Sequence, residues 1–477
     1  MVKINISKED VSNHETDVLI IGLFEGGKLE PKVKEIDNLI NNEISYLLSS
    51  KEFKGEKDQL KIINTHRKSL VKKIILVGLG KKAEFSREKL RRVSAKTAKL
   101  IRDQGTKKYS TSLVGDTGAI VEGIILGLYD FNKYKTEKEK IKEIEEVTLL
   151  GDHKENDVKR AEILANNVCY VRDLINEPAN TVTTETLANE AKKLNTNVKV
   201  LDIKEIKKLG MGGIENVGKG SDKEPKLILI DYNSNKGSPI VLIGKGITFD
   251  SGGLDLKPGS YMEDMKSDMA GAATVLGTVK AAIELKIKKR VVVVIPVAEN
   301  KPGSKAYRPG DILKAYNGKT VEVANTDAEG RLLLMDAISY AEKTYKPKAI
   351  IDIATLTGAS IIALGHEIVS LMSNDNDLKT KLMKASEKTD EKMWELPLID
   401  DYKDLIKSDI ADFRNVPKES VGPGTIVGGI FLSNFIEKTP WIHLDIGAAG
   451  WANSDNSYKK RGGTGVCLRT FIKFLEE

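Results

Sequence analysis

The chain has 477 residues, too many for one ordinary hydrophobic core, so two or three domains are expected. Its 75 basic residues nearly balance 69 acidic ones, and the net charge of +6 indicates a highly charged surface rather than a nucleic-acid-binding patch. Hydrophobic residues make up 40% without any run near the roughly 20 residues of a membrane span, and two cysteines exclude a disulfide framework or a cysteine zinc site.

Strands and helices alternate through the first part of the chain, which predicts an α/β domain over residues 1–153. Apolar β-rich runs predict strands, and apolar residues at helical spacing predict helices. The predicted strands are Val18–Leu23, Lys73–Val77, Ser112–Val114 and Val147–Leu150, and the predicted helices are Arg87–Asp103 and Ala119–Tyr129. A long periodic segment from about Asn156 to Ile175 then predicts a linker helix, residues 154–177.

Residues 178–477 continue the alternation over a length sufficient for a mixed or parallel sheet between two helical layers. The predicted strands are Lys226–Ile230, Ile240–Ile243, Arg290–Ile295, Val321–Ala324, Ala349–Ile353 and Ile442–Leu444. The predicted helices are Thr184–Leu194, Tyr261–Leu285, Arg331–Lys343, Asp377–Lys388 and Gly424–Glu437.

The most informative run is Val-Ala-Asn-Thr-Asp-Ala-Glu-Gly-Arg-Leu, residues 323–332. Asp327 and Glu329 lie two residues apart behind a β-branched segment, and Arg331 follows at the same interval. In an extended strand these three side chains emerge on one face. Carboxylates crowded in this way repel unless a cation lies among them, and such oxygen ligands suit divalent metals. The run therefore predicts a metal site for one ion or two.

A glycine-rich segment, residues 244–253, follows the predicted strand Ile240–Ile243 and contains Asp250. Glycines let the backbone approach a ligand, and loops after strand ends are where open α/β sheets bind ligands. Asp264 and Asp268 share a face at helical spacing, although Asp264 equally suits a helix N-terminus. The five histidines form no zinc motif and lie outside these segments, so oxygen ligands are expected to dominate the site.

These segments closely resemble those of the cytosolic leucyl aminopeptidases, which are hexameric two-metal exopeptidases. The resemblance lies in residues 244–258, 262–271, 325–332 and 354–359, and it covers essentially all of the second part of the chain, through Asp412, residues 422–424 and residues 443–445. The first part matches only in size and in the order of its strands and helices. The resemblance implies an α/β fold with a smaller, macro-like N-terminal domain, a linker helix, and a larger α/β/α catalytic domain with a mixed central sheet.

The resemblance further implies that two divalent ions, Mn²⁺ or Zn²⁺, bind Lys245, Asp250, Asp268, Asp327 and Glu329. Asp250 and Glu329 would bridge the ions. Lys245 must be neutral to act as a ligand, and two nearby dications disfavour its ammonium form.

Lys257 and Arg331 would form the catalytic pair that does not bind metal. The implied mechanism is attack by a metal-bridging water or hydroxide on the scissile carbonyl, which Lys257 polarises. In the family, bicarbonate held by the arginine transfers the proton, and the forked guanidinium of Arg331 suits that ligand. Alternatively, Arg331 pairs with Glu329, since a guanidinium commonly pairs with a neighbouring carboxylate.

By position, a small set of residues would line the pocket for the first side chain of the substrate: Met265, Thr355, Leu356, Gly358 and Gly447. Several members of the family carry alanine where this chain has Gly447 and a larger residue where it has Gly450, so both positions lose side-chain volume here. Leucine is the expected N-terminal residue, and tolerance for Met or Phe is a hypothesis.

The primary prediction is a metal-dependent aminopeptidase that releases N-terminal residues from peptides as a homohexamer, a dimer of trimers. The N-terminal sequence lacks the apolar core of a secretion signal, so a cytoplasmic location is expected. An alternative is a DNA-binding architectural protein, because some relatives of the family bind DNA, and the net charge neither requires nor excludes it. A third is another two-metal hydrolase such as a phosphatase, against which the apolar pocket argues.

Overall fold

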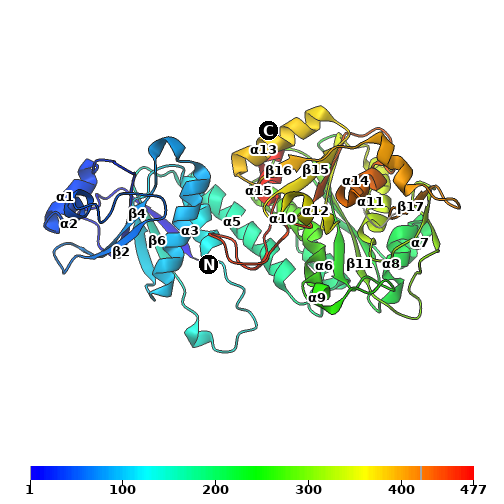
Figure 1. The fold of residues 1–477 in the computed structure, drawn as a ribbon, viewed down its shortest axis with the longest axis horizontal. Coiled ribbons are helices and arrows are strands. Elements are labelled where there is room, and N and C mark those ends of the chain that lie inside the picture. The colour runs from blue at the N-terminus through cyan, green and yellow to red at the C-terminus, as the bar shows by residue number, and fades with distance from the viewer. Residues whose placement is uncertain (1, 419–421) are drawn as a thin grey trace. The chain divides into compact units, whose positions relative to one another are not determined.

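The computed structural model describes residues 2–418 and 422–477, which form two compact units (Figure 1). The first unit contains residues 1–166 together with 454–460, and the second contains residues 167–453 together with 461–477. Across the described residues, no helix has both the length and the apolar character needed to cross a membrane.

The first unit is built on a six-stranded sheet in the order β1-β6-β5-β2-β4-β3. Neighbouring strands are parallel except for β3 and β4. The strands are β1 (Lys3–Ser7), β2 (Thr16–Leu23), β3 (Leu60–Asn64), β4 (Val71–Gly78), β5 (Lys108–Thr111) and β6 (Glu146–Leu150). The helices are α1 (Pro31–Leu39), α2 (Glu43–Ser49), α3 (Arg87–Asp103) and α4 (Thr117–Leu128), and α3 packs against α4.

Most elements predicted for this unit are present, but the predicted strand Ser112–Val114 was wrong. The strand at this place, β5, ends at Thr111. Beyond it the chain passes through Gly115, whose φ of 135° favours glycine, and Asp116 caps α4 by accepting a hydrogen bond from the amide of Ala119. The apolar residues that suggested a strand include Leu113, whose side chain is buried next to Gly22 although it lies outside any strand.

A 22-residue helix, α5 (Glu155–Asn176), passes from the first unit to the second between residues 166 and 167. It occupies the segment for which a linker helix was predicted. We propose domain boundaries of 1–153, 154–177 and 178–477.

The second unit contains a nine-stranded sheet in the order β16-β15-β18-β14-β9-β11-β8-β7, with β10 paired to β11. Its centre, from β18 to β11, is parallel, whereas β15, β8 and β7 each add an antiparallel pairing. The predicted mixed sheet is therefore confirmed. The strands are β7 (Asn197–Leu201), β8 (Lys226–Tyr232), β9 (Ile240–Gly244), β10 (Gly246–Asp250), β11 (Val291–Asn300), β14 (Ala349–Ala354), β15 (Val369–Ser373), β16 (Met393–Glu395) and β18 (Trp441–Asp445).

Two small sheets accompany the large one. The first contains β12 (Ile312–Lys314), β13 (Thr320–Glu322) and β17 (Phe413–Arg414), and the second contains β19 (Trp451–Ala452) and β20 (Gly462–Gly463). The predicted strand Val321–Ala324 corresponds to β13, so it lies outside the large sheet.

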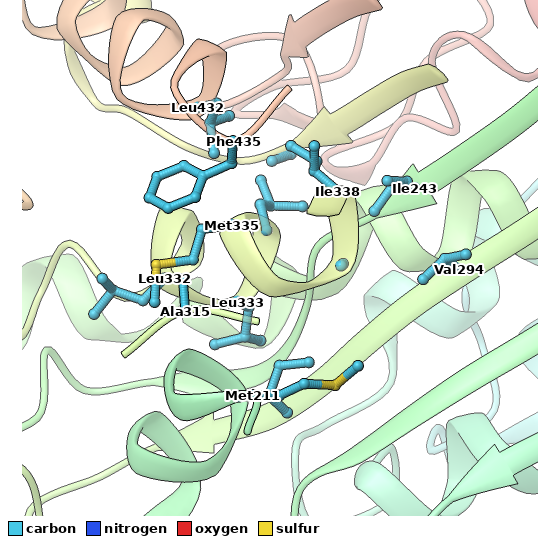
Figure 2. Close-up of a cluster of buried hydrophobic side chains, with 14 of the residues drawn as sticks. Met211, Ile243, Val294, Ala315, Leu332, Leu333, Met335, Ile338, Leu432 and Phe435 are labelled. Atoms are coloured by element: carbon cyan, nitrogen blue, oxygen red, sulfur yellow. The ribbon is translucent and has the colours of Figure 1, made fainter. Parts of the chain in front are cut away.

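Helices cover both faces of the large sheet. The helices of this unit are α6 (Thr184–Lys192), α7 (Ile203–Leu209), α8 (Gly212–Val217), α9 (Gly259–Met262), α10 (Ala270–Glu284), α11 (Gly330–Tyr345), α12 (Ala359–Leu364), α13 (Asn376–Thr389), α14 (Gly424–Ser433) and α15 (Leu468–Glu476). Figure 2 shows the core around α11, where Met335 and Ile338 lie near Ile243 of β9 and Phe435. Successive strand residues face opposite ways, and Leu242 is as fully buried as Ile243, so both faces of the sheet are covered.

The predicted helix Tyr261–Leu285 is divided into three pieces: α9, a 3₁₀ helix over Met265–Met269, and α10. Asp264 breaks the α-helical path with φ −91° and ψ 3°. The tighter 3₁₀ turn buries Asp268 beside β10. The break in the helix therefore places Asp268 beside Asp250, the last residue of β10.

Candidate active site

The candidate site lies where several strands of the large sheet end. Lys245 follows β9 directly, Asp250 is the last residue of β10, and Thr355 follows β14. Because β9, β11 and β14 are parallel and β10 pairs in parallel with β11, these carboxyl ends meet at one edge of the sheet. This is the edge at which open α/β sheets bind ligands.

The run 323–332 contributes to this edge through a turn and a helix, not through a strand as predicted from its spacing. Asp327 lies in a turn, Glu329 immediately precedes α11, and Arg331 is in the first turn of that helix. The prediction that these side chains share the face of a strand was wrong. The turn nevertheless brings both acids to the site.

Three carboxylates from two separate parts of the chain converge here. Asp250, Asp327 and Glu329 each present an oxygen, and these atoms lie within 4.8 Å of one another. Asp268 joins them through Lys245, whose Nζ lies 2.8 Å from Asp268 Oδ1 and 2.8 Å from Glu329 Oε1. The structure thus brings the five predicted metal ligands together.

A second lysine faces the same carboxylates. Lys257 Nζ lies 2.9 Å from Asp250 Oδ2 and also contacts Asp327 Oδ1. Its side chain is 14% exposed, whereas that of Lys245 is only 4% exposed. Lys257 is therefore the more accessible of the two cations to an entering substrate.

Burial and mutual repulsion control the ionisation of the acids. Burial raises the pKa of Asp250 to about 6, and the charge of Glu329 adds to the effect. Burial, supported by Glu329 and Asp250, also raises the pKa of Asp268 well above its usual value, despite the opposing charge of Lys245. Burial opposes ionisation of Glu329 as well, but Lys245 and Lys257 hold its pKa below the usual range.

The two lysines are stabilised as cations by these acids. Burial disfavours the charged form of Lys245, but Asp268 and Glu329 outweigh it and raise its pKa above the ordinary value. The pKa of Lys257 is raised in the same way, with Asp250 and Glu329 outweighing burial. For the amine of Lys245 to bind a metal, the incoming ion must therefore displace its proton.

The donor set fits divalent cations. Asp268 Oδ2 and Glu329 Oε2 are buried oxygens that accept no hydrogen bond from any described residue. Buried carboxylate oxygens without partners are costly, and a bound cation offsets that cost. Four carboxylates and one amine around a shared centre are hard ligands of the kind that Mn²⁺ and Zn²⁺ accept.

Residues that sequence reasoning missed hold these ligands in place. Asn300, at the end of β11, donates from Nδ2 to Asp250 Oδ1 at 2.8 Å and to the carbonyl of Thr326 at 3.0 Å. Tyr307 donates to the same carbonyl, and Asp255 accepts from the Thr326 amide at 2.7 Å. The available signal was that the apolar run of β11 ends in two polar residues, Glu299 and Asn300.

Arg331 lies beside the carboxylates with part of its guanidinium free of protein partners. Its Nη1 donates to the carbonyl of Asn415 at 2.6 Å, and its guanidinium lies 5.9 Å from the ring centroid of Phe431. Its Nε is buried and has no hydrogen-bond acceptor among the described residues. Within the same residues, Glu329 forms its ion pair with Lys245 and none with Arg331. The alternative of a simple Arg331–Glu329 pair therefore finds no support here.

The residues predicted to line a pocket lie next to these groups. Thr355 accepts from Lys245 Nζ through its carbonyl and donates from Oγ1 to Asp268 Oδ1 at 2.6 Å. Leu356 and Met265 are half-buried, and Gly358 is exposed with open space where a Cβ would be. Gly447 differs from this pattern, since a Cβ there would lie 2.5 Å from the carbonyl oxygen of Thr357. An alanine at 447 would have to displace backbone, so this glycine permits a close approach of two loops.

Comparison with known proteins agrees with the geometry. Residues 169–472 match the cytosol aminopeptidase family, catalytic domain, and residues 20–138 match the N-terminal domain of the same family. A probable cytosol aminopeptidase of Alkaliphilus oremlandii is 41% identical and the match covers 100% of this chain and 99% of that protein. A probable cytosol aminopeptidase of Geobacter sp. is 40% identical, with 99% of each chain covered.

Solved structures give the same result. A mutant of tomato leucine aminopeptidase superposes with a TM-score of 0.89 at 31% identity, covering 100% of this chain and 96% of that one. The bottromycin maturation enzyme BotP in complex with Mn superposes with a TM-score of 0.86 at 29% identity, covering 96% of this chain and 99% of that one. With both domains matched and relatives at about 40% identity over the full length, this chain belongs to the cytosol aminopeptidase family of two-metal aminopeptidases.

Proposed function

We propose that this metal-dependent aminopeptidase releases leucine and other bulky apolar residues from the N-termini of peptides. The observation that carries the proposal is the buried cluster of Asp250, Asp268, Asp327 and Glu329 around Lys245, with Lys257 beside it. The names of the relatives, which are cytosol or leucine aminopeptidases, support the same activity.

The five residues of the cluster would hold two Mn²⁺ or Zn²⁺ ions. When bound, the ions lower the pKa of water and so supply a nucleophile near neutral pH. Asn300 fixes the Asp250 carboxylate, which keeps the ligand geometry from relaxing when charge changes during the reaction.

Lys257 would stabilise the developing oxyanion on the scissile carbonyl. The carboxylates that raise its pKa keep it cationic throughout the neutral pH range. A preorganised cation in a partly buried site costs little reorganisation when negative charge appears. Its partial exposure is consistent with contact to substrate.

Arg331 would hold a small anion such as bicarbonate that accepts the proton from the nucleophile. Its position two residues after Glu329 places a guanidinium beside the cluster, and its buried Nε has no acceptor among the described residues. A planar guanidinium binds planar oxyanions with two parallel hydrogen bonds.

Hydrolysis of leucine p-nitroanilide tests the assignment. We expect activity that chelator abolishes and manganese restores, and we expect the Glu329→Ala variant to lose on the order of 10³-fold in kcat/KM because a carboxylate that would hold metal is removed. Full activity in chelator, or in that variant, would contradict the two-metal assignment. A panel of aminoacyl amides tests the side-chain preference, and a strict preference for small residues would contradict it.

We further propose a homohexamer, a dimer of trimers, and a cytoplasmic location. The relatives' designation as cytosol aminopeptidases supports the location. The subunit mass of 52.5 kDa gives about 315 kDa for six copies, which light scattering after size-exclusion chromatography measures. The alternative of a DNA-binding architectural protein gains no support from the relatives, whose names describe peptidases.

A further inference from the structure

One buried carboxylate beside the site has no place in the chemistry above. Asp445 is the last residue of β18, is fully buried, and lies opposite Ala354 at the end of β14. It is too deeply enclosed to meet solvent, and a buried acid needs a specific set of donors to remain in place. Its partners therefore indicate its role.

Asp445 gathers four donors from two loops. Its Oδ1 accepts from the amides of Leu356 at 3.1 Å, Thr357 at 3.4 Å and Gly447 at 2.9 Å. Its Oδ2 accepts from the hydroxyl of Thr357 at 2.6 Å. The loop after β14 (residues 355–358) and the loop after β18 (residues 446–450) are thereby tied to one carboxylate.

The close approach of the two loops depends on Gly447. A Cβ at this position would lie 2.5 Å from the Thr357 carbonyl oxygen and 3.1 Å from Asp445 Oδ1. The Thr357 carbonyl is also held by Ser360, whose Oγ donates to it at 2.8 Å. The loop 355–358 is thus fixed on several sides, with Asp445 at the centre.

The same loop touches the metal ligands. The Thr355 carbonyl accepts from Lys245, and its hydroxyl donates to Asp268. A shift of Leu356 and Thr357 would move the wall of the pocket, whereas Thr355 has its own anchors to the cluster.

We propose that Asp445 is a positioning residue that sets the shape of the substrate pocket by holding the backbone of Leu356 and Thr357. The inference rests on the proposed assignment of the loop 355–358 to the pocket for the first side chain. The bond between Oδ2 and the Thr357 hydroxyl is the part that can be removed selectively, because asparagine keeps Oδ1 for the three amides but has no acceptor at the second position.

The test compares Asp445→Asn, Thr357→Val and the double variant. We expect each single variant to raise KM for leucine p-nitroanilide at least tenfold while kcat stays within threefold and the metal content is unchanged. The preference for leucyl over alanyl substrate should fall by a similar factor. Both changes delete the bond between Asp445 and the Thr357 hydroxyl, and Thr357→Val also removes the contact of this hydroxyl with Thr425 Oγ1 at 3.0 Å. The double variant should therefore lose no more than twofold beyond Thr357→Val alone. Thr357→Ser, which keeps the hydroxyl, should retain the low KM.

Asp352→Asn is the matched control. Asp352 is an equally buried acid on the neighbouring strand β14, and it accepts from Trp441 Nε1 at 2.7 Å and pairs with His443 at 2.5 Å, not with the pocket loop. This variant should lower the melting temperature without raising KM. An unchanged KM in Asp445→Asn, the same KM rise in Asp352→Asn, or multiplying effects in the double variant would each overturn the proposal.

Amide hydrogen exchange provides a readout that is independent of activity. In Asp445→Asn, the peptide covering residues 353–360 should exchange at least tenfold faster than in the wild type, and in Asp352→Asn it should not. Unchanged exchange would overturn the positioning role. Faster exchange in Asp445→Asn, combined with a wild type that hydrolyses no aminoacyl substrate, would support the role of Asp445 in holding the loop 355–358. That combination would refute the proposed function instead.

Discussion

At the residue scale, each lysine of the site forms ion pairs with two of the four carboxylates. Lys245 contacts Asp268 and Glu329, and Lys257 contacts Asp250 and Asp327. The two lysines differ in depth, however, and only Lys245 is enclosed. A bound metal would take over the charge balance of Lys245, while Lys257 stays a cation that can move toward substrate.

This difference predicts separate effects for Lys257. Replacing it by alanine should lower kcat about 10²- to 10³-fold, the usual loss on removal of one oxyanion donor, and should leave two metals per subunit. Steady-state kinetics together with metal analysis measure both effects. Lys257→Arg keeps the charge and should lose less than Lys257→Ala.

Lys266→Ala is the matched control for that prediction. Lys266 is a half-buried lysine nearby that donates to the carbonyl of Asn176 at 2.7 Å and contacts none of the four carboxylates through the ion pairs described. Its loss should leave kcat within threefold. Loss of metal in Lys257→Ala would show that this lysine supports the ligands and has no separate catalytic role.

At the element scale, the sequence predicted which segments meet but not always their conformation. Apolar β-rich runs predicted the strands β9 and β14, whose carboxyl ends hold Lys245 and Thr355. The spacing of Asp327, Glu329 and Arg331 suggested a strand, because residues at i, i+2 and i+4 share a strand face. A turn followed by a helix start brings the first two together equally well, and local spacing cannot distinguish the two arrangements.

Local sequence patterns could not predict the residues that support the ligands. Asn300 approaches Asp250 from 50 positions along the chain, and Asn415 approaches Arg331 from 84 positions. Such contacts arise from the pairing of β10 with β11 and of β13 with β17, which no periodicity in one segment encodes. The resemblance therefore predicted the metal ligands, whereas the residues that hold these ligands in place became visible only in the tertiary structure.

The junction between α8 and α11 offers a prediction about pH. Asp336 of α11 is fully buried and accepts from the amides of Ile214 at 3.0 Å and Tyr316 at 2.8 Å. Burial raises its pKa to about 7, although the backbone amides oppose the shift. Its folded-state pKa is therefore above the value of about 3.9 expected in the unfolded chain.

A raised pKa means that the folded state holds the proton more tightly. The resulting stability is present below about pH 4 and is lost as the pH rises to about 7, with a slope of up to about 1.4 kcal/mol per pH unit. Asp336→Asn cannot titrate, so the advantage of the wild type over this variant should shrink between pH 4.5 and 7.5. Urea unfolding across that range measures the difference. A constant difference would show that Asp336 ionises normally.

At the scale of the whole molecule, the cluster concentrates negative charge inside the second unit while the first unit has no share in it. Metal binding should therefore stabilise the second unit and leave the first unaffected. A ligand that binds only the folded state stabilises it by RT ln(1 + [L]/Kd), which is about 2.7 kcal/mol at a hundredfold excess over Kd. For a protein of this size, such a change corresponds to several degrees in melting temperature.

Differential scanning calorimetry with and without chelator tests this prediction. We expect two transitions, of which only the larger, belonging to the second unit, moves down in chelator and returns when manganese is added. The Glu329→Ala variant should resemble the chelated wild type and respond little to manganese. If both transitions moved together, the two units would unfold as one, and if neither moved, the ions would contribute no stability to the fold. Since Asp268 Oδ2 and Glu329 Oε2 have no hydrogen-bond donor among the described residues, the second outcome would mean that water alone satisfies these buried oxygens.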